Sequence, residues 1–172
     1  MAPSRREHPR AHSRTGARSS SAVLDGRWRV DDHVRSHVAK QKATQDWASV
    51  RRYHGWITAN SMASGGFVSS KFLDFCHSLV LVHAYSVLQS VLEQYKREGT
   101  FSARGRELKT LMKASSSVLP WADFAKVDDG RERRNDIAHK GQFLPRSDSW
   151  SYMKAIEAEL VNWGVIPQQS PW

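Results

Sequence analysis

Apolar side chains recur every three or four residues along most of the chain, which is the spacing of one buried helix face. From about Asp31 to Asn60 this stripe predicts a long helix, whose positive N-terminal end suits acidic residues such as Asp31. The positions of the stripe are Val34, Val38, Trp47, Val50, His54 and Ile57. Two glycines within residues 61–66 then predict a turn, because glycine is costly inside a helix. A second helix is expected to begin near Ser69 or Ser70.

A central helix is predicted between Lys71 and Lys96. Its apolar residues keep helical spacing over about seven turns, which is too long for an ordinary strand. These residues are Phe72, Phe75, Cys76, Leu79, Val82, Val87, Val91, Leu92 and Tyr95. Gly99 is expected to end the segment.

Shorter helices are predicted in the second half of the chain. One spans Glu107 to Lys113, and Pro120 fits the first turn of the next one. Residues 128–130, with the sequence Asp-Asp-Gly, predict a turn or a kink. A further helical segment covers residues 131–139, and Gly141 is placed to close it in a left-handed conformation.

The last predicted helix has candidate N-caps in residues 147–149 and ends at Gly164. Its apolar stripe consists of Trp150, Met153, Ile156, Leu160 and Trp163. The sequence shows no alternating strand pattern, hairpin turn or internal repeat. We therefore expect an all-α protein, a four-to-five-helix up-and-down bundle over residues 24–166, with tails at 1–23 and 167–172.

The composition fits one compact domain, since 40% of the 172 residues are apolar and seven are tryptophans. The net charge of +9 is uneven, because residues 1–23 hold five arginines against one glutamate. That tail has too few apolar residues to order itself by burial. It either strengthens nonspecific contact with RNA or is a solvated leader without a role in recognition. Its composition also overlaps that of organelle transit peptides, although two prolines interrupt the helix such peptides need.

The expected location is cytoplasmic. Cys76 is the single cysteine, so no intrachain disulfide can form and a reducing compartment is expected. We expect no membrane partner, because no apolar stretch is judged to reach the roughly 18 residues that a bilayer requires. The N-terminus also lacks the apolar core of a secretory signal.

The segment from Arg133 to Gly141 carries the strongest chemical signal in the chain. On a helix, Asn135 and His139 are four residues apart and share a face, and Arg134 is long enough to curl back toward it. A guanidinium can hold a phosphodiester, and an imidazole can move protons beside it. The spacing alone is also that of a solvated helix face with a histidine near the negative end of the dipole.

The residues Arg134, Asn135 and His139, late in an all-α chain, resemble the R-x4-6-H motif of the HEPN superfamily. The resemblance implies a HEPN-type bundle that forms a homodimer, in which two copies of the motif face each other in a shared cleft. It also implies a metal-independent endoribonuclease of toxin–antitoxin or antiphage defence systems, with Arg134 and His139 catalytic and Asn135 assisting. The implied reaction is attack of the RNA 2′-hydroxyl on its own phosphate, which leaves a 2′,3′-cyclic phosphate.

The resemblance also bears on how the protein is regulated and on whether it is an enzyme. Toxins paired with a nucleotidyltransferase antitoxin often have a tyrosine two positions after the histidine, where this chain has Gly141. Control by modification of that tyrosine is therefore not expected, although an antitoxin or regulatory protein remains open as a partner. Other HEPN proteins are noncatalytic helical adaptors or RNA-binding subunits, and this is the alternative function.

Basic residues surround the motif. Arg131, Arg133 and Lys140 are candidates for holding the RNA backbone. They are equally suited to pair locally with Glu132 and Asp136 as solvating charges.

Other candidate sites are weaker. His33 and His37 have the i, i+4 spacing of a helical metal site, but no glutamate stands between them and cysteine ligands are absent, so a solvated face is preferred. No metal and no cofactor are expected. His77 and His83 border the central apolar stripe and are interpreted as structural. The tryptophans of the helix stripes are interpreted as core residues in preference to base-stacking residues. They are Trp47, Trp121, Trp150 and Trp163.

Overall fold

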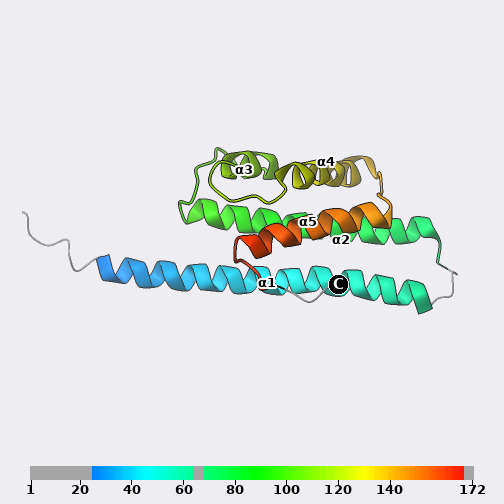
Figure 1. Cartoon of the computed structure of the whole chain (residues 1–172), viewed down its shortest axis with the longest axis horizontal. Coiled ribbons are helices and arrows are strands. Elements are labelled where there is room, and N and C mark those ends of the chain that lie inside the picture. The colour runs from blue at the N-terminus through cyan, green and yellow to red at the C-terminus, as the bar shows by residue number, and fades with distance from the viewer. Residues whose placement is uncertain (1–24, 64–67, 169–172) are drawn as a thin grey trace, which may run out of the picture.

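The structure is a computed structural model that describes residues 25–63 and 68–168, with the side chains of residues 37–63 and 68–168. Its five helices are α1 (Asp25–Ala63), α2 (Ser70–Arg97), α3 (Leu108–Ser115), α4 (Phe124–Lys140) and α5 (Arg146–Asn162). The described residues contain no strand, so the predicted all-α bundle is confirmed. Successive long helices reverse direction, as Figure 1 shows for α1 and α2 and for α4 and α5. The expectations for the tail at 1–23 and for the side chains of Asp31, His33 and Val34 lie outside the described residues.

The helix α2 is the centre of the bundle and packs against each of the other four helices. It begins where the sequence predicts, because the Ser69 side chain accepts a hydrogen bond from the backbone N–H of Phe72 at 3.2 Å. It also ends as predicted, just before Gly99, whose φ of 77° is the left-handed conformation that favours glycine. The most enclosed part of the core lies along this helix, at Leu81, Leu88 and Leu92 among others.

The apolarity of α2 exceeds the expectation from the sequence. By length and composition it meets the criterion for a membrane-crossing helix, with a mean hydropathy of 1.4 over its most apolar stretch. The prediction that no stretch reaches this length and apolarity is therefore wrong for α2. In the bundle 56% of the stretch is buried by the other helices, and a core helix of a soluble protein meets the same criterion.

Two predicted core positions of α2 face outward. Phe72 is 55% exposed and Leu79 is 47% exposed, so their predicted burial is wrong. Residues seven apart share one helix face, and here that face is turned away from the core. The apolar residues of α2 therefore form two sides, one buried and one exposed.

The helix α1 is longer than predicted, and its N-terminal part runs out past the ends of the other helices (Figure 1). Its buried face runs through Ala43, Trp47, Val50 and His54, in steps of three and four residues. Val38 is 58% exposed, which contradicts its predicted burial. Val38 lies five positions before Ala43, so its side chain is rotated by about 140° from that face.

The helix α4 is continuous through residues 128–130, so the prediction of a turn there is wrong. Gly130 serves close packing instead, since a Cβ there would lie 2.2 Å from the hydroxyl of Tyr85 and 2.6 Å from the ring of Tyr152. Pro120 lies ahead of the helix, and its N-cap is Asp123. The predicted end is confirmed, because Gly141 has a φ of 65° and its N–H bonds to Asp136 and Ile137 carbonyls.

The helix α5 starts earlier than predicted, at Arg146, and Pro145 is its N-cap. None of residues 147–149 is its N-cap, and Ser149 is buried. Its end is as predicted, since Gly164 follows with a φ of 63°. Along its stripe Met153, Ile156 and Leu160 are buried, and the two tryptophans are half-buried.

Candidate functional site

The last two turns of α4 carry Arg134, Asn135 and His139. The helix is anchored to the bundle by buried Val127 and Ile137. This anchoring fixes which face of the helix is exposed. Asn135 and His139, four residues apart, share a face as predicted.

The Arg134 side chain curls toward that face. Its Nη1 donates a hydrogen bond to Oδ1 of Asn135 at 3.2 Å. Its Nε is enclosed and has no hydrogen-bond partner among the described residues. The described part of the chain also places no carboxylate within ion-pair distance of Arg134, so its positive charge is not neutralised by a neighbour.

The other predicted cations of this region are paired. Arg131 is only 4% exposed and forms ion pairs with Asp128 at 2.6 Å and Glu132 at 3.2 Å. Arg133 lies 3.8 Å from Asp129, which also accepts a hydrogen bond from the Tyr152 hydroxyl. Burial and pairing make Arg131 a structural residue of α4.

Lys140 is exposed and forms an ion pair with Asp136 at 2.7 Å. The hydrogen bond from Lys140, together with the positive charges of Lys140 and Arg133, holds the pKa of the Asp136 carboxyl below its ordinary value. Lys140 and Arg133 remain on the surface, where their partners are exchangeable. They are the two predicted RNA contacts that an RNA could reach.

His139 is exposed in the last turn of α4, and its side chain has no hydrogen bond or ion pair among the described residues.

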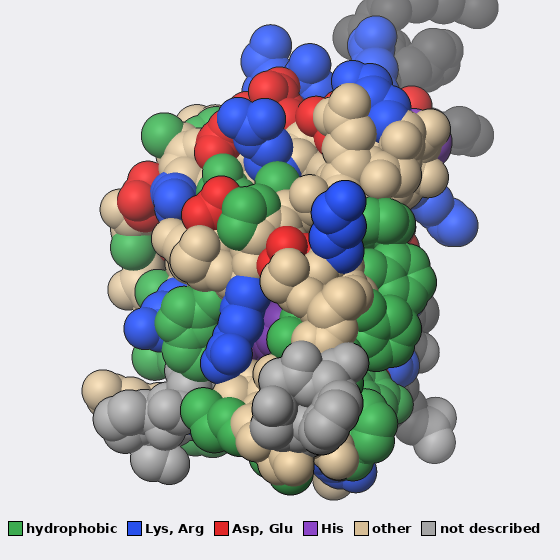
Figure 2. Space-filling view, turned by 90° about the vertical axis from the view of Figure 1, so that its right-hand side faces the viewer, with side chains coloured by type: hydrophobic (Ala, Val, Ile, Leu, Met, Phe, Trp, Pro, Cys, Tyr) green, Lys and Arg blue, Asp and Glu red, His purple; other side chains and the backbone are tan. Residues whose placement is uncertain are grey.

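Just beyond His139, Phe143 packs edge-on against Phe75 of α2, with ring centroids 4.9 Å apart. Phe143 is itself 44% exposed and continues the outward face of α2. We call Phe72, Phe75, Leu79 and Phe143 the apolar strip. Figure 2 looks onto this end of the bundle and shows hydrophobic side chains along one side, with mixed basic and acidic ones above.

Arg134, Asn135 and His139 provide a cation, a carboxamide and an imidazole. These groups can bind a phosphodiester and move protons beside it. No protein-family model, curated protein or solved structure matches the chain. The support for a role of Arg134 and His139 therefore comes from their own chemistry and surroundings.

The described residues contain no group of three or more histidine, cysteine or acidic side chains placed to hold a metal ion. His37 is exposed on α1. Burial raises the pKa of the Cys76 thiol, which disfavours a thiolate nucleophile.

A second candidate region, which the sequence did not single out, lies between α1 and α5. These helices touch through long side chains, since Arg146 donates to Thr58 at 3.2 Å and the ring of His54 stacks on Trp150 at 4.3 Å. The space left beside these contacts is a hollow of about 690 Å³, which we call the α1–α5 hollow. It is lined by Arg51, His54, Gly55, Thr58, Ala59, Met62, Arg146, Ser147 and Trp150.

Two histidines lie close together beside this hollow. Burial, then the neighbouring His77 and Arg146, lowers the pKa of His54 to about 4. Burial and Arg146 lower the pKa of His77, which Asp74 partly opposes. His77 is fully buried, but neither of its ring nitrogens has a hydrogen-bond partner among the described residues, so the expectation that its hydrogen bonds are satisfied is wrong. One sequence feature could have pointed to this region: His54 is a titratable residue at a position of the apolar stripe of α1.

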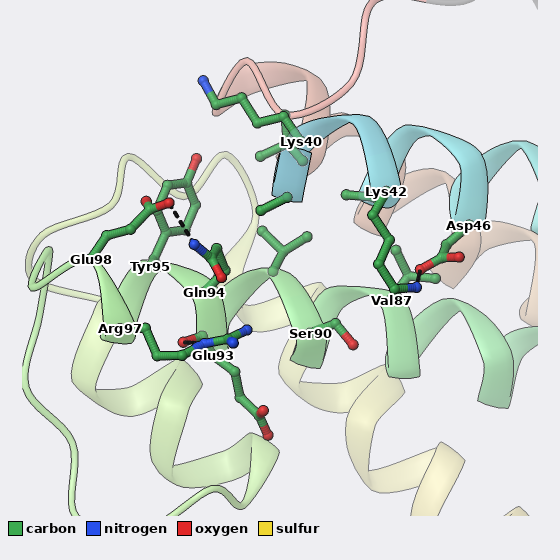
Figure 3. A pocket seen from close by; sticks show the side chains of 14 residues that line it. Lys40, Lys42, Asp46, Val87, Ser90, Glu93, Gln94, Tyr95, Arg97 and Glu98 are labelled. Atoms are coloured by element: carbon green, nitrogen blue, oxygen red, sulfur yellow. Dashed lines mark hydrogen bonds and ion pairs between the residues drawn. The ribbon is translucent and has the colours of Figure 1, made fainter. Parts of the chain in front are cut away.

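A smaller hollow of about 170 Å³ lies between α1 and the C-terminal part of α2 (Figure 3). Polar side chains on its rim pair with each other, as Lys42 with Asp46 at 2.6 Å and Gln94 with Glu98 at 2.7 Å. Its lining carries charges of both signs, including the acidic residues Asp46, Glu93 and Glu98. Arg134, Asn135 and His139 line neither hollow.

Proposed function

We propose that the protein is a metal-independent endoribonuclease of the HEPN type that acts as a homodimer. One observation carries the proposal: on the last turns of α4, where Arg131, Arg133 and Lys140 are ion-paired, Arg134 is held only by a neutral carboxamide. A cation kept in place without a carboxylate retains its charge for a phosphate.

In the proposed reaction the 2′-oxygen of a ribose attacks the adjacent phosphorus. One His139 takes the 2′ proton, and the bond to the 5′-oxygen breaks as a second imidazole supplies a proton to that leaving oxygen. Arg134 stabilises the charge that grows on the non-bridging oxygens. The products are a 2′,3′-cyclic phosphate and a 5′-hydroxyl.

The second imidazole is proposed to come from a second copy of the chain. The support for this is the apolar strip, which ends at Phe143, four residues after His139. Exposed apolar surface of this kind marks contact surfaces between proteins. Pairing of two strips brings two copies of the motif toward each other.

The alternative is a noncatalytic helical adaptor or RNA-binding subunit that uses the same face. It is favoured by the open position of His139, which lines neither hollow. In this case the apolar strip binds a partner and the motif cations hold RNA without cutting it.

Cleavage of RNA by the purified protein tests the proposal. Total or transfer RNA is incubated with and without a chelator, using the parent, His139→Ala and Arg134→Gln. We expect chelator-resistant cutting that falls by about 100-fold or more in both variants, with cyclic phosphate ends and no cutting of DNA. His37→Ala and Arg52→Gln, at exposed positions of α1, are the matched controls and keep parental activity.

The absence of cutting by a dimeric parent, together with retained RNA binding, contradicts the nuclease and supports the adaptor. Growth arrest on expression in a host cell, relieved by His139→Ala, supports the proposed role as a toxin or defence effector. Equal toxicity of parent and variant contradicts it.

A further inference from the structure

The α1–α5 hollow is cationic. Two arginines, Arg51 from α1 and Arg146 from α5, line it, and none of its lining residues is an aspartate or glutamate. Guanidinium groups on two helices that converge on one space are the usual means of binding an oxyanion.

Arg146 is the better placed of the two. Its guanidinium donates to the hydroxyl of Thr58, and no ion pair with a carboxylate is found for it among the described residues. The nearby Asp74 instead accepts a hydrogen bond from the backbone N–H of Arg146 at 2.9 Å. Asp74 therefore fixes the start of α5 and leaves the guanidinium charge available.

Arg51 is mostly buried and forms an ion pair with Glu157, with its Nη1 atom 3.6 Å from Oε1. Glu157 also accepts a hydrogen bond from the indole of Trp47 at 3.1 Å. Arg51 is therefore paired with Glu157, and its charge is offset by that carboxylate. An anion in the hollow would meet the guanidinium of Arg146 and the hydroxyl of Thr58, with the paired Arg51 beside them.

The rest of the wall is apolar, formed by Gly55, Ala59, Met62 and Trp150. The volume of about 690 Å³ lies in the range of sites for small organic ligands, which combine apolar walls with a few polar groups. Trp150 is already stacked on His54, with the Lys154 ammonium 4.8 Å from its ring centre. The wall therefore suits the side of an organic group.

We propose that the α1–α5 hollow binds a small organic phosphate, with Arg146 and Thr58 on the phosphate and Met62 and Trp150 against its organic part. The contrast with the smaller hollow supports this choice, because Asp46, Glu93 and Glu98 line that hollow and would repel an anion. This site is separate from the motif of α4, and its ligand does not depend on RNA cleavage.

Calorimetric titration of the full-length protein tests the site. The probes are uridine 5′-monophosphate, uridine and inorganic phosphate, because they separate the contributions of the phosphate and the organic part. We expect the monophosphate to bind more tightly than either fragment. Arg146→Gln should weaken it by about tenfold or more, since a charge-assisted contact is lost. Arg52→Gln, one position from Arg51 but outside the hollow, should leave binding unchanged.

Ala59→Trp is the second variant, because it fills the hollow and retains both arginines. It should abolish binding of the monophosphate while circular dichroism and the melting temperature show a folded protein. Absence of monophosphate binding by the parent overturns the proposal. So does binding that survives both Arg146→Gln and Ala59→Trp. Loss of RNA binding in Ala59→Trp without any affinity for the monophosphate also overturns it, and would assign the hollow to the RNA path.

Discussion

Asn135 accepts a hydrogen bond from the guanidinium of Arg134 through its Oδ1 atom, at 3.2 Å. The contact orients the arginine without cancelling its charge, because a carboxamide is neutral. The neighbouring cations differ, since Arg131 and Lys140 each face a carboxylate. The identity of residue 135 therefore decides how much charge Arg134 can offer to a phosphate.

Asn135→Asp tests this relationship with a side chain of nearly the same shape. The new carboxylate should pair with Arg134 and lower RNA cleavage by about tenfold or more. The free energy of unfolding should change by less than about 1 kcal/mol, because the pair is partly exposed. Initial cleavage rates and urea denaturation measure the two effects.

Asn135→Ala is the matched control. It removes the orienting contact but adds no opposing charge, so it should reduce cleavage less than Asn135→Asp does. Parental activity in Asn135→Asp would show that the charge of Arg134 is not used.

The apolar strip gives a prediction about assembly. Leu79→Arg places a charge in the middle of the strip and should make the protein monomeric, with loss of cleavage. Sedimentation equilibrium and the RNA assay measure the two effects on one preparation. Val118→Arg changes an equally exposed apolar residue outside the strip and should remain dimeric and active. A Leu79→Arg variant that is dimeric and active would exclude the strip as the interface.

The start of α2 and the ends of α2, α4 and α5 were the helix boundaries that the sequence predicted best. Ser69, Gly99, Gly141 and Gly164 act through backbone conformation and hydrogen bonds within a few residues, so their effect is visible locally. The contact between the Arg134 and Asn135 side chains could also be predicted from the local sequence. The reach of Arg134 toward Asn135 follows from helix geometry and the length of arginine.

What the sequence could not provide were features that depend on which helices meet. Gly130 reads locally as a turn, but two tyrosines from α2 and α5 explain why no side chain fits there. The hollow joins Arg51 and Arg146, which are far apart in the sequence and were not linked by any motif. The outward side of α2 was likewise indistinguishable from its core side, because both are apolar.

Gly130→Ala tests the close packing of α4. The added Cβ would overlap the Tyr85 hydroxyl, which donates a hydrogen bond of 2.8 Å to the Val127 carbonyl. We expect the free energy of unfolding to fall by about 1–3 kcal/mol, as for other overpacked sites. Urea denaturation measures this loss.

Gly55→Ala is the matched control for Gly130→Ala, since Gly55 is also inside a helix but a Cβ there meets no atom within 4 Å. It should raise stability by about 0.5–1 kcal/mol, because alanine is the better helix former. A loss in both variants, of similar size, would show that close packing is not the reason for glycine at position 130.

The buried histidines predict how stability depends on pH. The pKa of His54 is lowered to about 4 by burial and by the charges of His77 and Arg146, against 6.5 in the unfolded chain. Between these values the unfolded chain binds more protons than the folded one, so stability falls as the pH falls from 6.5 to 4. The loss from His54 is at most about 3 kcal/mol. His77, with its pKa lowered by burial and Arg146 against the opposing Asp74, acts in the same direction.

Urea denaturation at several pH values between 4 and 7 measures this slope. In His54→Gln the slope should be smaller than in the parent, whatever the stability of the variant at neutral pH, because one titrating group is gone. His37→Gln, which removes an exposed histidine of the same helix, should keep the parental slope. Equal slopes in all three proteins would mean that His54 takes up its proton as readily in the folded chain as in the unfolded one, and so that water reaches the ring.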